Sequence, residues 1–296
     1  MASIGYFPGC SLHGTSREYD ESLRALLAAL GTSVEEIDDW SCCGASSAHQ
    51  GGRLLGVALP ARNLARAEAQ GLSEVLAPCA ACYSRLAASR YEMDRDPALA
   101  AKVRLVLARE DFRNRVQVRN LLQVLRDRLA DLKAAVRVPL KDLRVAAYYG
   151  CLLVRPPEVT GAFDDPEAPS SMEDICRALG ATPVAWNRRL DCCGASLSLA
   201  RSPSVIRLGS AILQDARKAG AEAVVTACPM CHSNLDFRQG AMRNRGAFEG
   251  EMPVLFLSEL AGLALGIPPK ALGLQRHFVP TGSVTSRFAA AAGEVG

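Results

Sequence analysis

Short apolar runs and amphipathic segments alternate along the chain, and they recur in the same order in its two halves. The apolar runs are too short for buried helices and are bounded by turn residues, so they predict strands. In chain order, these strands are expected at residues 4–7, 34–37, 74–77, 116–118, 145–149, 183–186, 223–227 and 254–256. Strands that alternate with helices form parallel sheets with both faces covered. The pattern therefore predicts an α/β protein of two tandem, pseudo-symmetric βαβα modules, over residues 1–140 and 141–268.

The expected helices carry start and stop signals. Thr15-Ser16-Arg17-Glu18 and Ser170-Ser171-Met172-Glu173 fit capping boxes, in which a hydroxyl and a carboxylate bind backbone N–H groups at the start of a helix. Glycine is the common residue just beyond a helix C-terminus. The first two helices of each module are accordingly expected to stop at Gly31, Gly71, Gly180 and Gly220.

Three segments fall outside the repeat. Residues 156–169 form an extra loop in the second module. Residues 97–137 are rich in both Leu/Val and Arg/Asp and are expected to contain one amphipathic helix that links the modules. Residues 269–296 have no clear period, so we expect a C-terminal tail that is loosely held or wraps a partner.

Charge and hydropathy narrow the function. The net charge is +3, with 34 basic residues interleaved among 31 acidic ones, and this gives no footprint for nucleic acid. The N-terminus lacks the charged and apolar regions of a signal peptide. The apolar stretch 254–267 is interrupted by Ser258 and Glu259 and is too short to cross a bilayer. We therefore expect a cytoplasmic protein without a membrane span.

Ten of the eleven cysteines follow one five-cysteine pattern that is written twice: a single cysteine, a vicinal pair, and a Cys-x-x-Cys motif. The first quintet is Cys10, Cys42, Cys43, Cys79 and Cys82, and the second is Cys151, Cys192, Cys193, Cys228 and Cys231. In a chain without a leader, clustered thiolates favour a thiophilic metal over disulfides. Each cysteine group follows an expected strand, so both quintets should lie at the carboxyl ends of their sheets, where ligands bind. Helix N-termini there would stabilise an anionic metal–sulfide core.

The vicinal pairs Cys42-Cys43 and Cys192-Cys193 need a bent backbone. Successive side chains on a regular strand point to opposite faces, so both sulfurs can reach one centre only from a loop. Gly44 and Gly194 are expected to permit that bend. The alternative is a pair of vicinal disulfides, which are strained and rare.

Each Cys-x-x-Cys motif alone fits a thioredoxin-like redox pair, half of a zinc site or half of an iron–sulfur site. Zinc and cubane clusters both take four protein ligands, whereas each quintet offers five. The surplus thiolate suggests an unusual cluster, with one cysteine bridging two irons or one iron left open to substrate.

The two Cys-Cys-Gly modules, with Phe7-Pro8-Gly9-Cys10 at the start and Cys228-Pro229-Met230-Cys231-His232 late, resemble the B subunit of heterodisulfide reductase and its bacterial homologues. The resemblance covers nearly the whole chain. It implies two noncubane [4Fe-4S] clusters at which a disulfide is cleaved or formed in one-electron steps, with a thiol or disulfide as substrate. It also implies two partners, a small ferredoxin-like C subunit with cubane [4Fe-4S] clusters and a flavin-containing A subunit.

By matching positions, the resemblance assigns the first quintet to one cluster and the second quintet to the other, as ligands and as catalytic residues. Gly9, Gly44, Gly194 and Pro229 are assigned to the surroundings of the clusters. The chain has neither GxGxxG spacing near its first strand nor a GxxxxGK[ST] motif. We therefore expect this chain to bind no flavin or nicotinamide.

Other polar residues near the cysteines have two interpretations. His13, His49 and His232 could give a proton to a departing thiolate, or they could simply hydrogen bond to sulfur or backbone. Arg17, Arg53 and Arg155 could attract an anionic substrate. Cys176 lies within an expected helix between apolar neighbours and is best explained as a small buried hydrophobe.

Three functions remain open. The leading one is a disulfide-handling catalytic subunit. The second is an electron-relay subunit, as in related Cys-Cys-Gly proteins that accompany organic-acid dehydrogenases or serve as membrane-anchor subunits. The third is a zinc-stabilised scaffold without a redox role. Two complete quintets favour the first over the second, and five thiolates per site argue against the third. The identity of the disulfide and the direction of the reaction are not readable from the chain.

Overall fold

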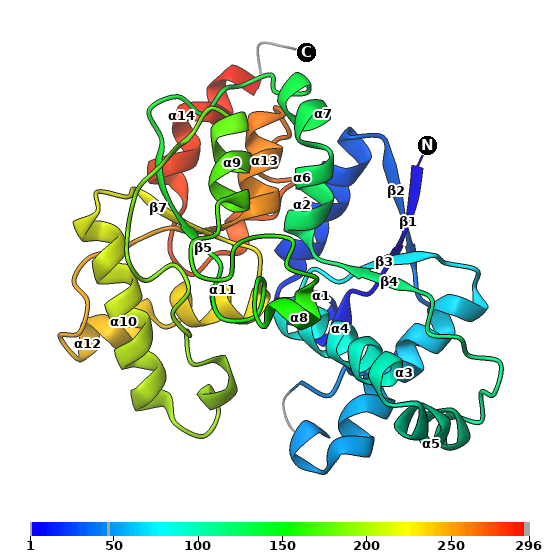
Figure 1. Ribbon diagram of the computed structural model, residues 1–296. Coiled ribbons are helices and arrows are strands. Elements are labelled where there is room, and N and C mark those ends of the chain that lie inside the picture. The colour runs from blue at the N-terminus through cyan, green and yellow to red at the C-terminus, as the bar shows by residue number, and fades with distance from the viewer. Residues whose placement is uncertain (1, 46–47, 293–296) are drawn as a thin grey trace.

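Two four-stranded parallel sheets form the framework, one from each half of the chain (Figure 1). The structure is a computed structural model and describes residues 2–45 and 48–292. The strand order is β2-β1-β3-β4 in the first sheet and β6-β5-β7-β8 in the second, and every paired strand is parallel to its neighbour. The predicted architecture of two similar α/β halves is confirmed.

In the first half, each strand leads into helical segments that cover the sheet, as the alternating pattern predicts. Its strands are short, and the longest pairing joins β1 to β2 over five residues. The elements in order are β1 (Ala2–Tyr6), α1 (Gly9–His13), α2 (Arg17–Ala29), β2 (Thr32–Glu36), η1 (Ala48–Gln50), α3 (Arg53–Ala69), β3 (Glu74–Leu76), α4 (Ala80–Arg95), α5 (Pro97–Leu107), β4 (Gln117–Arg119), α6 (Leu121–Asp127) and α7 (Leu129–Ala134).

The second half repeats this order, with a shorter edge strand and the extra segment after its first cysteine. Its elements are β5 (Arg144–Tyr148), α8 (Pro157–Thr160), α9 (Ser171–Ala178), β6 (Thr182–Pro183), η2 (Ala195–Leu197), α10 (Ser202–Lys218), β7 (Ala223–Thr226), α11 (Pro229–Leu235), α12 (Gln239–Asn244), β8 (Val254–Phe256), α13 (Leu257–Ala264), η3 (Leu274–Arg276) and α14 (Gly282–Ala292). The expected glycine stops are in place, since Gly31, Gly71, Gly180 and Gly220 all have positive φ just beyond a helix.

The two predicted capping boxes are wrong, although the helices begin where the sequence predicts. α2 starts after Ser16 and α9 after Ser170, and neither side chain caps its helix. In the second case the carboxylate has other partners: Glu173 accepts a hydrogen bond from the Tyr149 hydroxyl and pairs with Arg189 at 3.3 Å. Tertiary contacts thus replace the local motif.

The expectation of one amphipathic helix over residues 97–137 is also wrong. The segment contains three helices, α5, α6 and α7, besides β4, which agrees with the strand predicted at residues 116–118. Asp96 starts α5 by accepting a hydrogen bond from the Leu99 N–H at 3.0 Å, and Ala108 ends it in the left-handed conformation, with φ 51°. A second break at Arg128 separates α6 from α7.

Residues 269–288 are packed, so the expectation of a loosely held tail is wrong for them. Most of their large apolar side chains are buried, namely Leu272, Leu274, Val279, Val284 and Phe288, although Phe278 is exposed. α14 packs against α13, beside which it lies in Figure 1.

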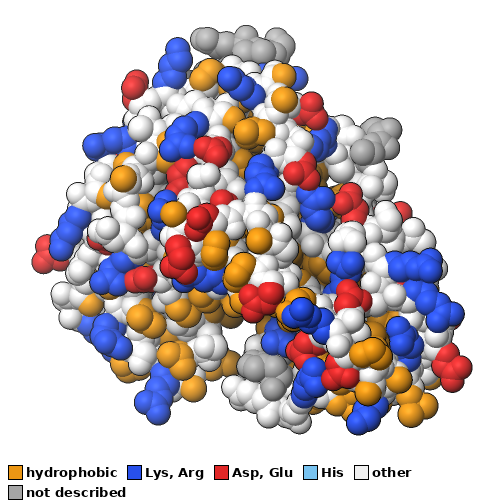
Figure 2. Space-filling model, viewed as in Figure 1, with side chains coloured by type: hydrophobic (Ala, Val, Ile, Leu, Met, Phe, Trp, Pro, Cys, Tyr) orange, Lys and Arg blue, Asp and Glu red, His pale blue; other side chains and the backbone are white. Residues whose placement is uncertain are grey.

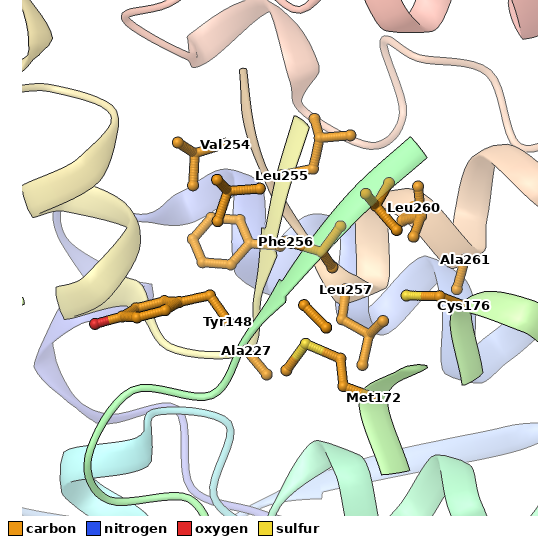
Figure 3. Packing of buried hydrophobic residues seen from close by; sticks show 14 of the residues in the cluster. Tyr148, Met172, Cys176, Ala227, Val254, Leu255, Phe256, Leu257, Leu260 and Ala261 are labelled. Carbon is orange, nitrogen blue, oxygen red and sulfur yellow. The ribbon is translucent and has the colours of Figure 1, made fainter. Parts of the chain in front are cut away.

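Helices from the two halves pack against each other. α2 of the first half packs against α13 of the second, and α9 of the second packs against α6 of the first. One hydrophobic core therefore runs through both halves, and Figure 3 shows the part of it where Met172 and Cys176 lie near Leu257 and Ala261 of α13. A separate, smaller core lies under α3 and α4 of the first half. The shared core fixes the carboxyl edges of the two sheets relative to each other.

Candidate metal–sulfur centres

The cysteines lie where the sequence places them, just beyond the carboxyl ends of the strands. In the first half, Cys10 follows β1, the vicinal pair follows β2, and Cys79 follows β3 and caps α4. β1 and β3 are adjacent in the sheet, and their carboxyl ends flank the crevice where such sheets bind ligands. The second half repeats this arrangement after β5, β6 and β7.

The first quintet gathers at one edge of its sheet. The sulfurs of Cys43 and Cys82 are 3.3 Å apart. Cys82 also shares a hydrogen bond with Cys79, and Cys42 is close enough to Cys43 and Cys10 for their charges to affect it. Cys43, Cys79 and Cys82 are buried, whereas Cys10 and Cys42 are exposed. The quintet therefore has a closed inner side and an open outer side.

The second quintet has the same plan. The sulfurs of Cys193 and Cys231 are 3.6 Å apart, and Cys151 shares a hydrogen bond with Cys192. Cys193, Cys228 and Cys231 are buried, Cys192 is exposed and Cys151 is half-buried. All eleven cysteines, which fall within the described residues, are free thiols, so the vicinal disulfides weighed above are not formed.

Gly44 and Gly194 bend the vicinal pairs as predicted. Their φ angles are +77° and +82°, a conformation that costs a residue with a Cβ about 1–2 kcal/mol. The N–H of Gly44 points back to the sulfur of Cys42 at 3.4 Å, and that of Gly194 to the sulfur of Cys192 at 3.3 Å. The bend thus supplies a backbone donor to each outer thiolate.

A second pair of glycines lies directly against the inner sulfurs. A Cβ on Gly9 would be 2.9 Å from the sulfur of Cys82, and one on Gly150 would be 3.1 Å from that of Cys231; both glycines have φ +65°. Sequence reasoning misses Gly150, although the Gly-Cys dipeptide opens each quintet in the same way. Pro229 occupies the first turn of α11 after the cap Cys228, where its missing N–H costs nothing.

Neighbouring sulfurs lower the pKa of three cysteines. The Cys82 thiol, helped by backbone N–H groups and Arg85, outweighs burial and lowers the pKa of Cys43 to about 7. The Cys151 thiol likewise lowers the pKa of Cys192 to about 6, and Cys231 and Cys79 lower that of Cys228 well below its ordinary value. Each quintet therefore has at least one thiolate readily available as a metal ligand.

The two quintets meet at the boundary between the halves. Cys79 and Cys228 lie close enough across it for each to shift the pKa of the other, and the Ser11 hydroxyl donates to the sulfur of Met230 at 3.9 Å. Tyr19 lies beside this contact, since burial and the charges of Cys228 and Cys79 raise its pKa well above the ordinary value. The two candidate centres are neighbours.

For the histidines, the structure favours a role in hydrogen bonding or ion pairing over that of a proton donor to a thiolate. His13 pairs with Glu36 at 3.0 Å, and Nε2 of His232 lies 3.0 Å from the Val254 carbonyl oxygen. The side chain of His49 is outside what the structure describes.

Two of the three candidate arginines are engaged by carboxylates. Arg53 pairs with Glu92 and Asp96, at 2.8 and 2.9 Å, and Arg155 pairs with Glu167 at 2.7 Å. Arg17 is exposed on α2. Cys176 is fully buried in the core, apart from the quintets, as expected of a small hydrophobe.

A buried polar network ties the C-terminal segment to the second quintet. His277 pairs with Glu259 at 2.8 Å, and both side chains are fully buried. His277 Nδ1 lies 3.4 Å from Nε2 of His232, the neighbour of Cys231. Asp236 accepts the N–H groups of Phe278 and Val279 at 2.8 and 3.1 Å. The ligating atoms of His232, Asp236 and His277 lie within 4.8 Å of one another, but all of these groups already have hydrogen-bond partners. The sequence does not predict this network, because the C-terminal segment lacks a hydrophobic period.

The donor set suits an iron–sulfur group. Five sulfurs per site, helix N-termini at the Cys-x-x-Cys motifs and backbone N–H groups aimed at sulfur all favour an anionic sulfur-rich core. A structural zinc ion would leave one thiolate of each quintet without a role.

A protein-family model described as a cysteine-rich domain, CCG, matches residues 4–87 and 145–236, so each match contains one whole quintet. A protein of Wolinella succinogenes, the 8-methylmenaquinol:fumarate reductase membrane anchor subunit, is 38% identical over 276 residues, which are 93% of this chain and 96% of that one. The B subunit of the Ferredoxin/F(420)H(2)-dependent CoB-CoM heterodisulfide reductase of Methanosarcina acetivorans is 29% identical over 286 residues, 94% of each chain. A heterodisulfide reductase B-subunit-like protein of Archaeoglobus profundus is 28% identical over 278 residues, 91% of this chain and 93% of that one. The resemblance stated from the sequence is confirmed.

Among solved structures, a hypothetical protein from Helicobacter pylori superposes with a TM-score of 0.76 at 14% identity. The match covers 94% of this chain and 52% of that chain, so this chain spans about half of its length. At this identity the likeness concerns the fold. Along the part of the chain that the structure describes, no helix combines the length and the apolarity needed to cross a membrane.

Proposed function

The chain belongs to the cysteine-rich CCG domain family, and from this premise we propose that it is an iron–sulfur catalytic subunit of a heterodisulfide reductase-like complex. In this proposal the first quintet holds one noncubane [4Fe-4S] cluster and the second quintet holds another. The modules would be residues 1–140 and 141–268, with residues 269–296 as an appended segment. When bound, the two clusters would supply single electrons and thiophilic iron for cleaving or forming a disulfide or a related sulfane bond.

The contact between Cys79 and Cys228 carries the proposal. Cleavage of one S–S bond consumes two electrons and two protons and yields two thiols, so two one-electron centres side by side match its demand. The buried cysteines of each quintet would hold the metal–sulfur core away from water. Cys10, Cys42 and Cys192 are exposed and leave the outer side of both sites open to a thiol or disulfide substrate.

The partners follow from the same proposal. Relatives that share most of the chain are named as subunits of reductases, so this chain would work in a complex. We propose a ferredoxin-like subunit with cubane clusters as its electron partner and a flavin-containing subunit on the far side of that partner. Neither flavin nor nicotinamide is expected in this chain, and its place in the cytoplasm remains a prediction.

A second candidate is an electron-relay subunit without disulfide chemistry. The 38% identical relative, a fumarate reductase membrane anchor subunit, favours it. In that case the same cysteines would hold clusters that pass electrons between partner subunits, and no thiol would bind to them.

One experiment separates the candidates. The full chain, purified without oxygen, is reduced with dithionite and viologen, mixed with candidate disulfides, and followed by EPR and by thiol release. Two thiols per disulfide and a thiol-induced paramagnetic signal are expected for the catalytic subunit. Clusters that are reduced and reoxidised but ignore thiols would support the relay. A chain that binds zinc and no iron would contradict both.

A further inference from the structure

The backbone carbonyl in front of each vicinal cysteine pair accepts a hydrogen bond from a buried side chain, and the donor differs between the halves. In the first half, Asn63 of α3 is fully buried, and its Nδ2 donates to the Ser41 carbonyl oxygen at 3.0 Å. Its Oδ1 also accepts the Ser41 N–H at 2.8 Å. In the second half, the hydroxyl of Tyr148 on β5, which is fully buried too, donates to the Asp191 carbonyl oxygen at 2.6 Å. Ser41 and Asp191 directly precede the two pairs, so the same position of both loops is held.

Neither donor has a counterpart in the other half. Phe7 and Tyr148 both stand three residues before the first cysteine of their quintet, and the phenylalanine ring has no hydroxyl. Each ring packs on the glycine before that cysteine, at 3.4 Å for Phe7 and 3.7 Å for Tyr148 from where its Cβ would lie. Asn63 aligns with Ile212, since both stand eight residues before the glycine that follows their helix, and isoleucine cannot donate. The two halves therefore hold the same carbonyl with unrelated residues.

The held carbonyl belongs to the peptide that leads into the outer cysteine of each pair. Cys42 and Cys192 are exposed and lie on the open side of their quintets. Neither helix nor strand includes the residues around them, 38–44 and 188–194, so no regular backbone ladder fixes these loops. A polar backbone group that loses its partner destabilises the conformation that had paired it. The single side-chain donor in each half is thus placed to control how firmly the outer cysteine is held.

We propose that Asn63 and Tyr148 are positioning residues with one shared role: each fixes the loop of its vicinal pair, so that the outer cysteine stays within reach of the bound metal–sulfur core. This inference rests on the proposed function, because it assigns the outer cysteines to metal–sulfur centres. Neither side chain is given a role in the reaction itself, since each acts through the backbone of the loop. Loss of one such hydrogen bond shifts a local opening equilibrium by up to about tenfold.

The first test is Tyr148→Phe, which removes one hydroxyl and keeps the ring. Hydrogen exchange of the full chain should become up to about tenfold faster at residues 190–194, and a ferrous-iron chelator should remove about half of the iron faster by a similar factor. Exchange at residues 40–44 and the release of the remaining iron should keep their wild-type rates. Tyr149→Phe is the matched control: it removes the neighbouring hydroxyl, which bonds Glu173 and the Met172 N–H, and should leave the loop and the iron unchanged.

Asn63→Leu is the reciprocal variant. It should speed exchange at residues 40–44 and the release of the other half of the iron. Adding Phe7→Tyr to it supplies a hydroxyl at the position that Tyr148 occupies in the second half, and this should slow both rates again. Asn63 as a mere packing residue would not be rescued by a donor on a different element.

Unchanged exchange and iron release in Tyr148→Phe would overturn the inference, and so would an equal acceleration in the Tyr149→Phe control. A folded Asn63→Leu chain in which Phe7→Tyr restores nothing would also contradict the shared role. If Asn63→Leu does not fold, Tyr148→Phe alone decides. Wild-type chain without iron would instead contradict the proposed function, which hydrogen exchange of the loops does not test.

Discussion

Gly9 lies against the sulfur of Cys82 in the first half, and Gly150 lies against the sulfur of Cys231 in the second. The vicinal pairs are bent by Gly44 and Gly194 in nearly the same conformation. The polar side chains on the Cys-x-x-Cys helices differ between the halves: Asn234 lies 3.7 Å from the sulfur of Cys193, and Arg85 holds the equivalent position in the first half. The glycines at the sulfurs are thus repeated, whereas these polar side chains are not. The comparison suggests that a group bound by both quintets would constrain the glycines, while the polar side chains would give each site its own properties.

The C-terminal segment adds a second difference. Residues 269–288 reach His232, the neighbour of Cys231, through His277, and the described residues provide the first quintet with no equivalent network. The face shown in Figure 2 gives no sign of this asymmetry, because acidic and basic side chains are interleaved over it. The difference lies in buried groups, so variants of buried residues should expose it.

The largest effect is expected from removing one inner cysteine in either half. Cys82→Ser and Cys231→Ser should each lower the iron content from about eight to about four per chain, because each quintet would hold one four-iron cluster. Iron analysis and disulfide turnover measure this. Cys176→Ala is the matched control: it lies outside both quintets and should keep its iron while losing about 1 kcal/mol of stability. If only one of these two cysteine variants lost iron, the two quintets would not be equivalent.

Breaking the buried pair between His277 and Glu259 should have the next largest effect. His277→Ala leaves Glu259 as a buried charge without a partner, which typically lowers the free energy of unfolding by about 3–5 kcal/mol. Denaturant unfolding and hydrogen exchange should show α14 and the second quintet loosening before the first. The control is the neighbouring Arg276→Ala, which removes a surface pair with Glu21 and should lower the free energy of unfolding by less than about 1 kcal/mol. If His277→Ala loosened both halves equally, the difference between the two quintets would be contradicted.

Adding a methyl group beside the inner sulfurs tests whether the glycines of both halves are needed for metal binding. Gly9→Ala and Gly150→Ala should each lose about 1–2 kcal/mol from the positive φ and should also lose iron, because the new Cβ would press on Cys82 or Cys231. Gly31→Ala is the control. Its φ is +70° and no atom lies within 4 Å of the new Cβ, so it should lose stability and keep its iron. If all three variants keep their iron, the glycines serve only the backbone.

The smallest expected effect is a pH dependence of the docked C-terminal segment. Burial opposes it, but Glu259 and Asp236 raise the pKa of His277 above its ordinary value. Burial raises the pKa of the three carboxyl groups around it, those of Glu18, Asp236 and Glu259.

Groups with a raised pKa in the folded state stabilise it at low pH and lose that contribution as the pH rises through the raised value. Burial lowers the pKa of His232, which has the opposite sign but acts only below about pH 6.5. Protection of residues 269–288 from hydrogen exchange, corrected for intrinsic rates, should therefore fall as the pH rises above about 6.5. The surface cation Arg276 keeps its charge throughout and adds no slope. His277→Ala should remove most of this pH dependence. If the slope were unchanged in that variant, groups other than His277 would cause it.

The parts of the fold that follow from local chemistry could be predicted from the sequence. The predicted strands agree with the structure to within a few residues, because short β-branched and aromatic runs bounded by turn residues seldom form another kind of element. Gly44 and Gly194 could be assigned to bends because two adjacent side chains on a strand cannot face one site. The resemblance to a known family assigned all ten cysteines to two candidate sites, and the structure brings each quintet to one sheet edge.

The rest depends on contacts between distant segments. Glu173 belongs to a predicted capping box, yet it binds Tyr149 and Arg189, which are distant in the sequence. His277 lies in a segment without a hydrophobic period, and its partner Glu259 enters the sequence pattern only as an interruption of an apolar stretch. Arg85 and Asn234 can be aligned by the motif spacing, but the contacts of Asn234 with the Cys193 loop appear only in the structure. Such contacts between distant segments cannot be predicted from periodicity or motif spacing.

Metal analysis of the chain, purified without oxygen, tests the central claim most directly. If each quintet holds a four-iron cluster, we predict about eight iron atoms and about eight acid-labile sulfides per chain. Stoichiometric zinc without sulfide, or an iron content that stays at about eight per chain in both Cys82→Ser and Cys231→Ser, would contradict it.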